Sequence, residues 1–591
     1  MCHPCLTWEV SYKMATSISS SKFAEIIALA RARKLQQDNP PNIFTPPANA
    51  ESICPVGLAV QESQETNSDL TLEEMRMQEI LSHSTDKYGN TITYNSAQSA
   101  FVSLASSGQS CCLIGPAGTG KTTAMKGTVQ SLIQSPTCGI LQNHDHKHLP
   151  HGVPGIVICA YTRRATNNIR RNMDESMKAN CITIHKLLEY GPEYFQILNE
   201  NGEERTSMRF APMRNQTNPL PQEITTIIFE ESSMIGTQLY GEVLAALTHE
   251  VQIIFLGDIQ QLPPVFGPAI LGFKLTSLPT IELSEVYRQA LESPIIRLAH
   301  RILSGKPIPL AELPEWNFPG QLKITPWKKQ IDSDSALNVA EKLFAKLFSD
   351  GAYNPEDDII LIPFNKGFGT TELNKSIANH LAQNKGKVVW EVISGFLKHY
   401  FSVGDKVLFD REDAIILDIY PNPSYTGVPA QSESTYLDYW GHSHAPTQIT
   451  QTEEDKTNID IDFLLGQVAA DDVDRVTQSS HHIKLLMQDS DTEKTVTKAA
   501  EVNAMLLGYC LTVHKSQGSE WEKVFLLLHN SHATMMQREL LYTAVTRAKK
   551  ELFVICEGDT FTKAIKSQRI KGNTLAEKAE HFKGKQNDLQ S

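Results

Sequence analysis

The stretch CCLIGPAGTGKTTAMKG constrains the fold of this chain more than any other feature. Its core has the spacing Gly115-x-x-x-x-Gly120-Lys121-Thr122 and lies between an apolar, strand-like run and a helical pattern. Glycines in such a turn let backbone N–H groups surround a phosphate, while the lysine reaches the β- and γ-phosphates and the threonine offers a hydroxyl to Mg²⁺. The motif predicts ATP contacts at Gly115, Pro116, Ala117, Gly118, Thr119, Gly120, Lys121, Thr122 and Thr123.

A second strand-like stretch, TTIIFEESSMIG, ends in two adjacent glutamates, Glu230 and Glu231. A P-loop enzyme needs a neighbouring strand that brings one carboxylate to the Mg²⁺ shell and another to the attacking water. Two surface glutamates at the end of a strand would be the ordinary interpretation in isolation. With the P-loop upstream, we predict that these two residues supply the two carboxylates.

Further downstream, separate segments carry groups suited to phosphoryl transfer. IIFLGDIQQLPPV places Gln261 on a loop stiffened by two prolines, where a glutamine can sense a γ-phosphate. VYRQ carries Arg288 and LLYTAVTRAKKELFVI carries Arg547, and a planar guanidinium suits the clamping of a transferring phosphoryl group. Either arginine alone would be an ordinary salt-bridge residue, but the ordered set indicates a catalytic site.

Length and composition favour a multidomain α/β protein. The chain has 591 residues, 41% apolar and 20% charged, and from about Asn95 onward β-branched runs alternate with helical patterns, as in parallel α/β layers. Its 54 Lys+Arg against 67 Asp+Glu give a net charge of −13, so nucleic-acid binding needs a local basic groove rather than bulk charge. No apolar run approaches membrane-spanning length, and cysteines within apolar runs suit a reducing compartment. We expect an intracellular protein with no membrane partner.

Taken in order, the motifs resemble those of superfamily 1 DNA helicases of the RecD and phage Dda type (superfamily 1B, 5′ to 3′). The resemblance covers roughly residues 94–556, and the family's motifs are matched by YNSAQ, GPAGTGKT, VICAYTRRATNNI, TIHKLL, EESSM, GDIQQLPPV, YRQ, TVHKSQG and YTAVTRAK. One departure is clear, because Glu230 stands where the family usually has Asp. The additional methylene changes how the carboxylate reaches an octahedral Mg²⁺ shell, yet we expect a working ATPase.

The resemblance implies a role for each residue that matches a motif. Glu231 inherits the role of catalytic base and Gln98 that of the adenine reader. The implied catalytic set is Glu231, Lys121, Gln261, Arg288 and Arg547. The implied Mg²⁺ ligands are Thr122 and Glu230. Further implied ATP contacts are Gln517 and Gly518. The implied DNA contacts are Thr162, Arg163, Thr183, His185, Thr512 and His514.

The resemblance also implies the architecture: two RecA-like P-loop domains with ATP in the cleft between them, an inserted β-hairpin that acts as a pin, and a small SH3-like β-barrel insertion. An N-terminal arm, residues 1–85, is rich in Pro and Ser and is expected to be partly disordered. The first RecA-like domain is predicted at 86–280, with the hairpin at about 189–223. The second RecA-like domain is predicted in two parts, 281–395 and 501–560. Between these parts lies the barrel, 396–500, with a flexible segment at about 421–480, and a basic C-terminal tail follows at 561–591.

The hairpin is also predicted by the residues themselves. In YFQILNENGEERTSMRF, apolar and polar residues alternate on both sides of the turn signal Asn201-Gly202. In Dda-like enzymes a hairpin in this interval splits the duplex. Its tip is acidic here, so the wedge is assigned to the apolar flank, Tyr194 and Phe195; an ordinary structural hairpin is the alternative.

Several polar segments have two interpretations. The four arginines of TRRATNNIRR line a strand-binding groove or form a solvated helix face. The run NHDHKHLPH is interpreted as a polar loop rather than a metal chelator, and Cys2 and Cys5 lack the second ligand pair of a zinc site. The basic C-terminal segment contacts nucleic acid or is a solvated tail.

Together these features predict an enzyme, an ATP-dependent DNA helicase that moves 5′ to 3′ along single-stranded DNA in replication, recombination or repair. ATP and Mg²⁺ are its expected cofactors. Single-stranded and forked duplex DNA are its expected partners, together with replication or recombination proteins. Two alternatives stay open: an RNA helicase, and a helicase-like ATPase subunit that depends on a replisome or nuclease partner.

Overall fold

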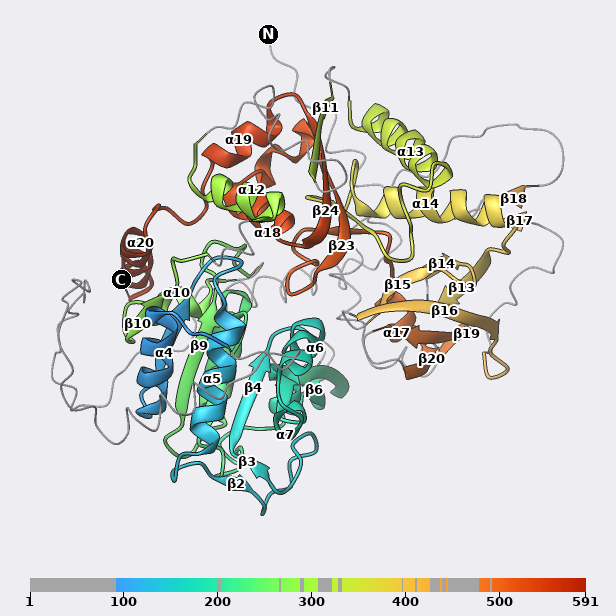
Figure 1. Ribbon diagram of the computed structural model, residues 1–591. Helices are drawn as coiled ribbons and strands as arrows, with labels where there is room; N and C mark the ends of the chain where they lie inside the picture. The colour runs from blue at the N-terminus through green and yellow to red at the C-terminus, as the bar shows by residue number, and fades with distance from the viewer. Residues whose placement is uncertain are drawn as a thin grey trace, which may run out of the picture. The chain divides into compact units, whose positions relative to one another are not determined.

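The computed structural model describes residues 92–198, 204–264, 267–286, 292–306, 322–327, 332–395, 397–409, 412–425, 436–437, 443–444, 478–488 and 492–590. All of these residues belong to one unit, residues 70–591, whose main layers are two parallel sheets and one antiparallel sheet (Figure 1). The predicted N-terminal arm and the Cys2–Cys5 pair lie outside the described residues. The predicted α/β class with parallel sheets is confirmed.

The first sheet has six parallel strands in the order β10-β1-β9-β8-β4-β5. Along β4 successive side chains point to opposite faces, with Ile156 and Ile158 in one apolar cluster and Val157 and Cys159 in the other. Both faces are covered, which is why these strands read as unbroken apolar runs in the sequence. The strands are β1 (Cys111–Ile114), β4 (Ile156–Ala160), β5 (Cys181–Thr183), β8 (Thr226–Phe229), β9 (Gln252–Gly257) and β10 (Thr280–Glu282).

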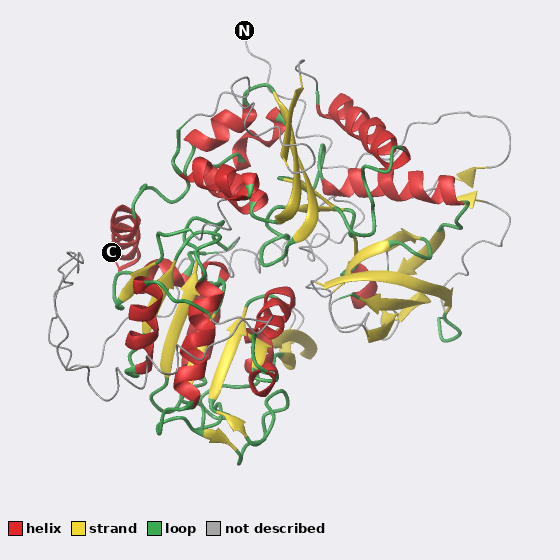
Figure 2. Cartoon of the chain, in the orientation of Figure 1, coloured by secondary structure: helices red, strands yellow, loops and turns green. Residues whose placement is uncertain are grey.

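Helices cover both faces of this sheet (Figure 2). One face packs against α4 (Ser96–Ser106), α5 (Lys121–Ile133), α6 (Arg163–Asn172) and α7 (Glu175–Lys178). The other packs against α8 (Ile184–Leu187), α9 (Thr237–Ala245) and α10 (Ile270–Lys274). A short 3₁₀ turn, η1 (Ser232–Met234), follows the paired glutamates.

The second sheet has five parallel strands in the order β11-β24-β23-β12-β22. The strands are β11 (Leu322–Trp327), β12 (Ile359–Ile362), β22 (Cys510–Thr512), β23 (Trp521–Leu528) and β24 (Ala548–Glu557). The remaining elements here are α12 (Pro294–Leu303), α13 (Ser333–Ser349), α14 (Thr370–Lys385), η6 (Asn530–Met535), α18 (Arg538–Val545) and α19 (Thr560–Lys566). Each of the two parallel sheets has helices on both faces. The first carries the P-loop and the second carries the last two motifs, which is the RecA-like α/β arrangement.

The chain between β12 and β22 adds an antiparallel sheet in the order β14-β13-β19-β16-β15-β21, with β20 paired to β19. One face is apolar, and a bulge between Ile416 and Asp418 shifts the alternation so that Ile416 and Ile419 both face the core. The segments predicted to build one small β-domain therefore do pair with one another. The elements are β13 (Trp390–Ser394), β14 (Leu397–Phe401), β15 (Lys406–Phe409), β16 (Glu412–Pro421), β19 (Gln478–Met487), β20 (Thr492–Lys498), α17 (Ala499–Asn503) and β21 (Leu506–Leu507), with a separate pair β17 (Tyr436–Leu437) and β18 (Ser443–His444).

Two hairpins project from the first sheet's connections. β6 (Gly191–Leu198) and β7 (Glu204–Ala211) pair in antiparallel register from Gly191–Ala211 to Leu198–Glu204, so the predicted hairpin is present. Its turn, with Asn201-Gly202, lies outside the described residues. The histidine-rich run forms the loop between β2 (Ile140–Leu141) and β3 (Val153–Pro154).

The C-terminal segment is more than a tail. Its last helix, α20 (Leu575–Gln590), contacts α10 of the first sheet, and the ring of Phe582 is buried in that sheet's apolar cluster, 5.8 Å from the ring of Phe273. A Cβ on Gly272 would lie 2.3 Å from the Phe582 ring, so glycine permits this approach. The helix is thus packed on the domain that carries the P-loop.

Among the residues that the structure describes, no helix combines the length and apolarity needed to cross a membrane. The cysteines in the same residues, Cys111, Cys112, Cys138, Cys159, Cys181, Cys510 and Cys556, are free thiols.

Candidate active site

The P-loop connects the buried strand β1 to the start of α5. Gly118 and Gly120 have φ values of 82° and 81°, a left-handed conformation that glycine adopts without strain. A Cβ on Gly115 would lie 2.6 Å from the hydroxyl oxygen of Thr119, so the loop closes tightly only with glycine there. The Thr119 hydroxyl is fully buried and donates to the carbonyl oxygen of Pro116 at 2.8 Å.

The Lys121 ammonium lies over this loop. It donates to the carbonyl oxygens of Gly115, at 2.6 Å, and Pro116, at 3.1 Å. Thr122 and Thr123 follow in the first turn of α5 and are partly buried. The positive group and the helix N-terminus therefore meet at one point, which is the arrangement that favours a bound phosphate.

The two glutamates follow the last residue of β8, as predicted. Glu231 has a φ of 51°, a conformation uncommon for a residue with a side chain, and its Oε2 is buried without a hydrogen-bond partner among the described residues. Burial raises the pKa of Glu231, against the lowering effect of Arg547 and Lys121. Burial and then the neighbouring Glu231 charge raise the pKa of Glu230 well above its ordinary value.

The next strand in the sheet, β9, ends beside these carboxylates. Gln261 is 5% exposed and its backbone N–H donates to the Asp258 carbonyl at 3.1 Å. Within the described part of the chain, the buried atoms Gln261 Oε1 and Ser233 Oγ also lack hydrogen-bond partners. Because buried polar atoms are nearly always paired, these atoms and Glu231 Oε2 are the expected contacts of a polar ligand.

Tyr542, in α18 of the second sheet, joins the P-loop to the end of β9. Its hydroxyl donates to Asp258 Oδ2 at 2.5 Å and accepts from the backbone N–H of Ala117 at 2.7 Å. Tyr542 and Asp258 are both fully buried. His300 Nε2 lies 3.3 Å from the Ala117 carbonyl oxygen. The N–H and the carbonyl of Ala117 are therefore both contacted by side chains from the second half of the fold, those of Tyr542 and His300.

A second bridge forms at Leu262, one residue after Gln261. The Leu262 N–H donates to Thr543 Oγ1 at 2.9 Å, and its carbonyl accepts from Gln517 Nε2 at 2.6 Å. The predicted ATP contact Gln517 is therefore used here to bind the loop that holds the predicted γ-phosphate sensor. A displacement of this loop would therefore change its hydrogen bonds to Thr543 and Gln517, which lie in the part of the chain that carries the second sheet.

The predicted arginines have different outcomes. Arg547 is buried and donates to the carbonyls of Thr543, at 2.9 Å, and Ser519, at 3.0 Å. Its positive charge lowers the pKa of both Glu230 and Glu231. Arg288 lies outside the described residues.

The predicted adenine reader is placed beside the P-loop but is already engaged. Gln98 is fully buried and forms a capping box with Asn95 at the start of α4, and its Nε2 donates to the Gly120 carbonyl at 3.2 Å. Its amide thus supports the phosphate loop from behind. Reading adenine through this side chain would require these contacts to change.

Two of the predicted DNA contacts serve as helix caps. Thr162 accepts from the Ala165 N–H at 3.1 Å at the start of α6, and Thr183 accepts from the Lys186 N–H at 3.2 Å at the start of α8. A Cβ on Gly518, which has a φ of 74°, would lie 2.7 Å from the Thr162 hydroxyl. The motifs that contain Thr162 and Gly518 therefore touch across the two sheets.

The other predicted DNA contacts lie in the motifs VICAYTRRATNNI, TIHKLL and TVHKSQG. The His185 ring packs between Tyr161 and Tyr190, with centroid distances of 5.6 and 5.0 Å. Arg163 opens α6 and is partly buried. Thr512 accepts from the Lys515 N–H at 3.3 Å. Burial, and then the charge of Arg569, lowers the pKa of His514.

Two arginines of the arginine-rich helix α6, Arg164 and Arg170, contact other parts of the protein. Arg164 donates to Asp413 Oδ2 at 3.0 Å, and its guanidinium lies 4.5 Å from the centroid of Trp521. Arg170 donates to the Cys181 carbonyl at 3.0 Å. Arg164 thus joins the first sheet to both the second sheet and the inserted sheet.

Sequence reasoning missed Tyr542, Asp258 and Glu520. Glu520 raises the pKa of both Glu230 and Glu231 by its charge. Each of the three lies within or next to a recognised motif, so its position in the sequence could have indicated that it lies near the site. Their contacts could not be assigned, because they join residues hundreds of positions apart.

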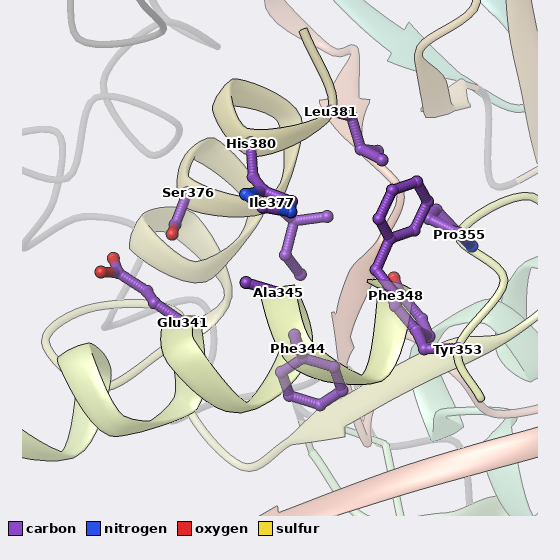
Figure 3. Close-up of a pocket in the computed structure, with 10 residues that line it drawn as sticks. All are labelled: Glu341, Phe344, Ala345, Phe348, Tyr353, Pro355, Ser376, Ile377, His380 and Leu381. Atoms are coloured by element: carbon purple, nitrogen blue, oxygen red, sulfur yellow. The ribbon is translucent and has the colours of Figure 1, made fainter. Parts of the chain in front are cut away.

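A separate pocket lies between α13 and α14 in the second part of the chain (Figure 3). Its lining is largely aromatic and aliphatic, with Phe344, Phe348 and Tyr353 prominent. None of the predicted site residues lines it. The catalytic candidates are therefore gathered at the P-loop instead.

Comparison with known proteins agrees with this geometry. Residues 93–316 match a family model described as an AAA domain, and residues 507–555 match one described as a UvrD-like helicase C-terminal domain. The ATP-dependent RecD2 DNA helicase of Deinococcus radiodurans is 28% identical over 463 residues, covering 78% of this chain and 49% of that protein. The predicted relationship to the RecD-type helicases is confirmed. The RecBCD enzyme subunit RecD of Buchnera aphidicola subsp. Schizaphis graminum, another RecD-type protein, is 23% identical over 59% of this chain and 57% of that one.

The chain spans about half the length of the curated RecD-type relatives it matches, 49% and 57% for these two. The crystal structure of the Pif1 helicase from Candida albicans, 16% identical, aligns over 84% of this chain and 99% of that one with a TM-score of 0.39.

Proposed function

We propose that this chain is an ATP-dependent DNA helicase of the RecD type that moves 5′ to 3′ along single-stranded DNA. The observation that carries this proposal is a P-loop closed by Lys121 together with Glu231, whose Oε2 has no partner in the described residues and whose pKa responds to the charges of Lys121 and Arg547. Such a set suits ATP hydrolysis between two domains. The choice of DNA as the proposed substrate is supported by similarity to a protein named ATP-dependent RecD2 DNA helicase.

In the proposed reaction, the P-loop amides and Lys121 hold the phosphates of ATP. Glu231 accepts a proton from the attacking water, Gln261 senses the γ-phosphate, and Arg547 and Arg288 stabilise charge on the transferring group. Thr122 and Glu230 offer a hydroxyl and a carboxylate oxygen, which are ligands that Mg²⁺ prefers, so the donor set fits this ion. A bound Mg²⁺ neutralises phosphate charge and favours the ionised form of nearby carboxylates.

Coupling to movement follows from the bridges between the two sheets. Tyr542 contacts both the P-loop and Asp258, and Gln517 and Thr543 hold Leu262 next to Gln261. A change at the γ-phosphate would thus alter contacts of both sheets together, which is the requirement for a two-state closure biased by ATP. Strand contacts from Thr162, Arg163, Thr183, His185, Thr512 and His514 would then alternate in tightness.

The remaining architectural assignments belong to the same proposal. The β6–β7 hairpin would act as the pin, with Tyr194 and Phe195 at the duplex junction. The antiparallel sheet of residues 390–507 would be the SH3-like insertion, which then begins before and ends after the predicted range of 396–500. Forked duplex DNA is the proposed substrate, and replication or recombination proteins are the proposed partners.

The test is ATP hydrolysis with and without single-stranded DNA, followed by unwinding of duplexes with a 5′ or a 3′ tail. We expect single-stranded DNA to stimulate hydrolysis, the 5′-tailed duplex to open, and Lys121→Ala to abolish both activities. If no nucleic acid stimulates hydrolysis, the motor proposal is wrong. Opening of only the 3′-tailed duplex would refute the polarity, and stimulation by RNA alone would refute DNA as the substrate.

A further inference from the structure

The base of the β6–β7 hairpin is closed by a buried ion pair. Glu189 precedes β6 and Arg214 follows β7, and Arg214 Nε donates to Glu189 Oε2 at 2.9 Å. Their side chains are only 5% and 3% exposed. The backbone closes at the same place, because the N–H groups of Met213 and Arg214 both donate to the Leu188 carbonyl, at 3.0 and 3.1 Å. Both ends of the hairpin are therefore fastened to each other.

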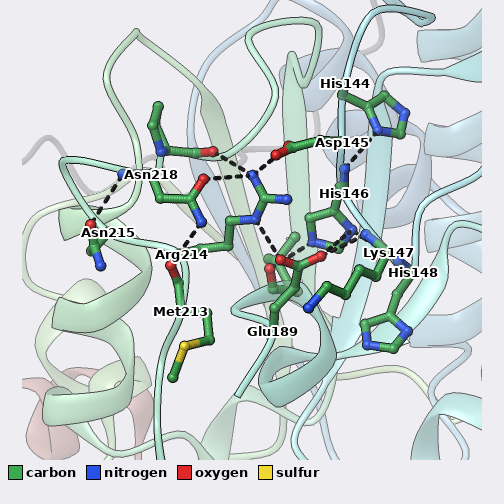
Figure 4. A network of polar contacts seen from close by, with 12 residues as sticks. His144, Asp145, His146, Lys147, His148, Glu189, Met213, Arg214, Asn215 and Asn218 are labelled. Atoms are coloured by element: carbon green, nitrogen blue, oxygen red, sulfur yellow. Dashed lines mark hydrogen bonds and ion pairs between the residues drawn. The ribbon is translucent and has the colours of Figure 1, made fainter. Parts of the chain in front are cut away.

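Arg214 also connects the hairpin base to neighbouring loops (Figure 4). Its Nη1 lies 2.9 Å from Asp145 Oδ1 in the histidine-rich loop, and donates to Asn218 Oδ1 at 3.2 Å and to the Pro219 carbonyl at 3.1 Å. Asn218 Nδ2 in turn donates to the Met213 carbonyl at 2.9 Å. The Arg214 guanidinium thus connects the histidine-rich loop to the segment that follows β7.

Glu189 completes this network from the other end of the hairpin. Its Oε1 accepts from the Lys147 N–H at 2.5 Å, and His146 Nδ1 lies 3.9 Å from the same oxygen. His146 Nε2 donates to the Leu187 carbonyl at 2.8 Å. Glu189 has a φ of 49°, a strained conformation for any residue except glycine. A glutamate in that conformation implies that its carboxylate compensates for the strain.

The same base is attached to the rest of the first domain by Tyr190. The Tyr190 hydroxyl donates to a carboxylate oxygen of Glu242 in α9, and its N–H donates to the His185 carbonyl at 2.9 Å. α9 follows the turn that carries the paired glutamates, and His185 is one of the proposed strand contacts. The hairpin base is therefore hydrogen-bonded both to α9 and to the segment that contains His185.

We propose that Glu189 and Arg214 are positioning residues that hold the β6–β7 hairpin rigid against the first domain, so that movement along the strand is converted into separation of the duplex. This inference rests on the proposed helicase function. A wedge must resist the reannealing duplex without yielding, and a two-stranded ribbon is marginally stable by itself. A buried, multiply hydrogen-bonded pair at its base supplies the missing rigidity.

The test compares three variants for duplex opening, DNA-stimulated ATP hydrolysis and amide hydrogen exchange of residues 191–198 and 204–211. Arg214→Gln removes the cation, and Glu189→Gly removes the carboxylate while relieving the backbone strain. The matched control is Arg209→Gln, which breaks an Arg–Glu pair within the hairpin itself, with Glu193 at 2.6 Å, whose side chains are 65% and 44% exposed.

We expect Arg214→Gln and Glu189→Gly to speed hairpin exchange and to slow unwinding of a 5′-tailed fork by roughly ten- to a hundredfold. DNA-stimulated ATP hydrolysis should change by less than about twofold, since neither residue touches the nucleotide site. Arg209→Gln should behave like the wild-type protein. Uncoupling of this kind would not result from a general loss of folding.

Unchanged hairpin exchange in both variants would overturn the inference, as would a loss of ATP hydrolysis in proportion to the loss of unwinding. If the wild-type protein opened no duplex, the proposed function would be wrong, and faster exchange in the variants would still establish that the pair holds the hairpin. Should a single variant fail to fold, Glu189→Gln combined with Arg214→Gln leaves no unpaired buried charge and replaces it in the same assays.

Discussion

Glu231 and Glu189 share an unusual backbone conformation but have opposite surroundings. Their φ values are 51° and 49°, and they are the only non-glycine residues with positive φ among those described. Glu189 accepts hydrogen bonds on both oxygens, from Arg214 and Lys147, whereas Glu231 Oε2 has no partner in the described residues. The protein therefore maintains strain at two glutamates for two different purposes.

The pKa values of Glu189 and Glu231 are shifted in opposite directions. Burial alone would raise the pKa of Glu189, but the hydrogen bonds from Arg214 and Lys147 hold it below its ordinary value. Burial raises the pKa of Glu231, and Arg547 and Lys121 offset this only in part. A satisfied carboxylate stabilises the structure around it, while an unsatisfied one remains available to a ligand. This difference agrees with the roles that we propose, positioning for Glu189 and chemistry for Glu231.

The largest expected effect is on hydrolysis at the unsatisfied glutamate. Glu231→Gln should lower the DNA-stimulated kcat by about 10²- to 10⁴-fold, the usual contribution of a general base, with little change in ATP affinity. Steady-state kinetics and nucleotide-binding titrations measure the two separately. Full activity of this variant would refute the base assignment.

At the satisfied glutamate we expect a loss of stability instead. Glu189→Gln should lower the free energy of unfolding by about 3 kcal/mol, because it removes the buried counter-charge of Arg214 and leaves only the exposed carboxylate of Asp145. Since the folded-state pKa of Glu189 lies below the ordinary value of 4.5, the contribution of its charge is complete above that pH and is lost as the pH falls through the folded value. Denaturant titrations of both proteins from pH 7 to pH 3 measure this.

The matched change Glu231→Gln has the opposite expected sign. The folded-state pKa of Glu231 is raised, so ionisation costs stability as the pH rises above the ordinary value, and the amide should stabilise the fold at pH 8. Equal destabilisation by the two substitutions would remove the contrast between the sites.

A smaller effect is expected where the two sheets meet. Tyr542→Phe removes the donor to the fully buried Asp258 and the acceptor for Ala117. The loss of a hydrogen bond to a charged group should raise the activation free energy by about 2 kcal/mol, roughly 30-fold in kcat. DNA-stimulated ATP hydrolysis measures this, and an unchanged kcat would show that the bridge is not used during turnover.

The smallest effect is expected at the residue beside Glu231. Glu230→Asp restores the residue usual in the family, and should change kcat by less than about tenfold, or 1.4 kcal/mol. The Mg²⁺ dependence of hydrolysis is the appropriate measurement. Loss of hydrolysis in this variant would show that the metal site is rebuilt around the longer side chain.

Much of the fold follows from local patterns. Apolar runs predicted β1, β8 and β9, and the alternating pattern around Asn201-Gly202 predicted the β6–β7 pairing. The glycines at 118 and 120 have the left-handed φ values that a phosphate loop uses. These features depend on residues close in sequence, whose preferences act without the rest of the chain.

Side-chain partners were harder to predict. The arginines of α6 indicated a groove or a solvated face, but Arg164 binds Asp413 and Trp521, 249 and 357 positions away in the sequence. The C-terminal segment indicated a basic tail, yet Phe582 is buried against the first sheet. Neither contact leaves a local signal, because each depends on which surfaces meet after the sheets have formed.

The sequence by itself determined the chemical groups of this protein: a phosphate loop, a pair of carboxylates, a glutamine and arginines in a fixed order. Only the tertiary structure decided how those groups are used. It bound Gln98 to the back of the P-loop, placed Tyr542 between Ala117 and Asp258, and satisfied Glu189 while leaving Glu231 Oε2 without a partner. Residue order specifies local backbone geometry, whereas hydrogen-bond satisfaction depends on burial, which arises only when distant segments pack together.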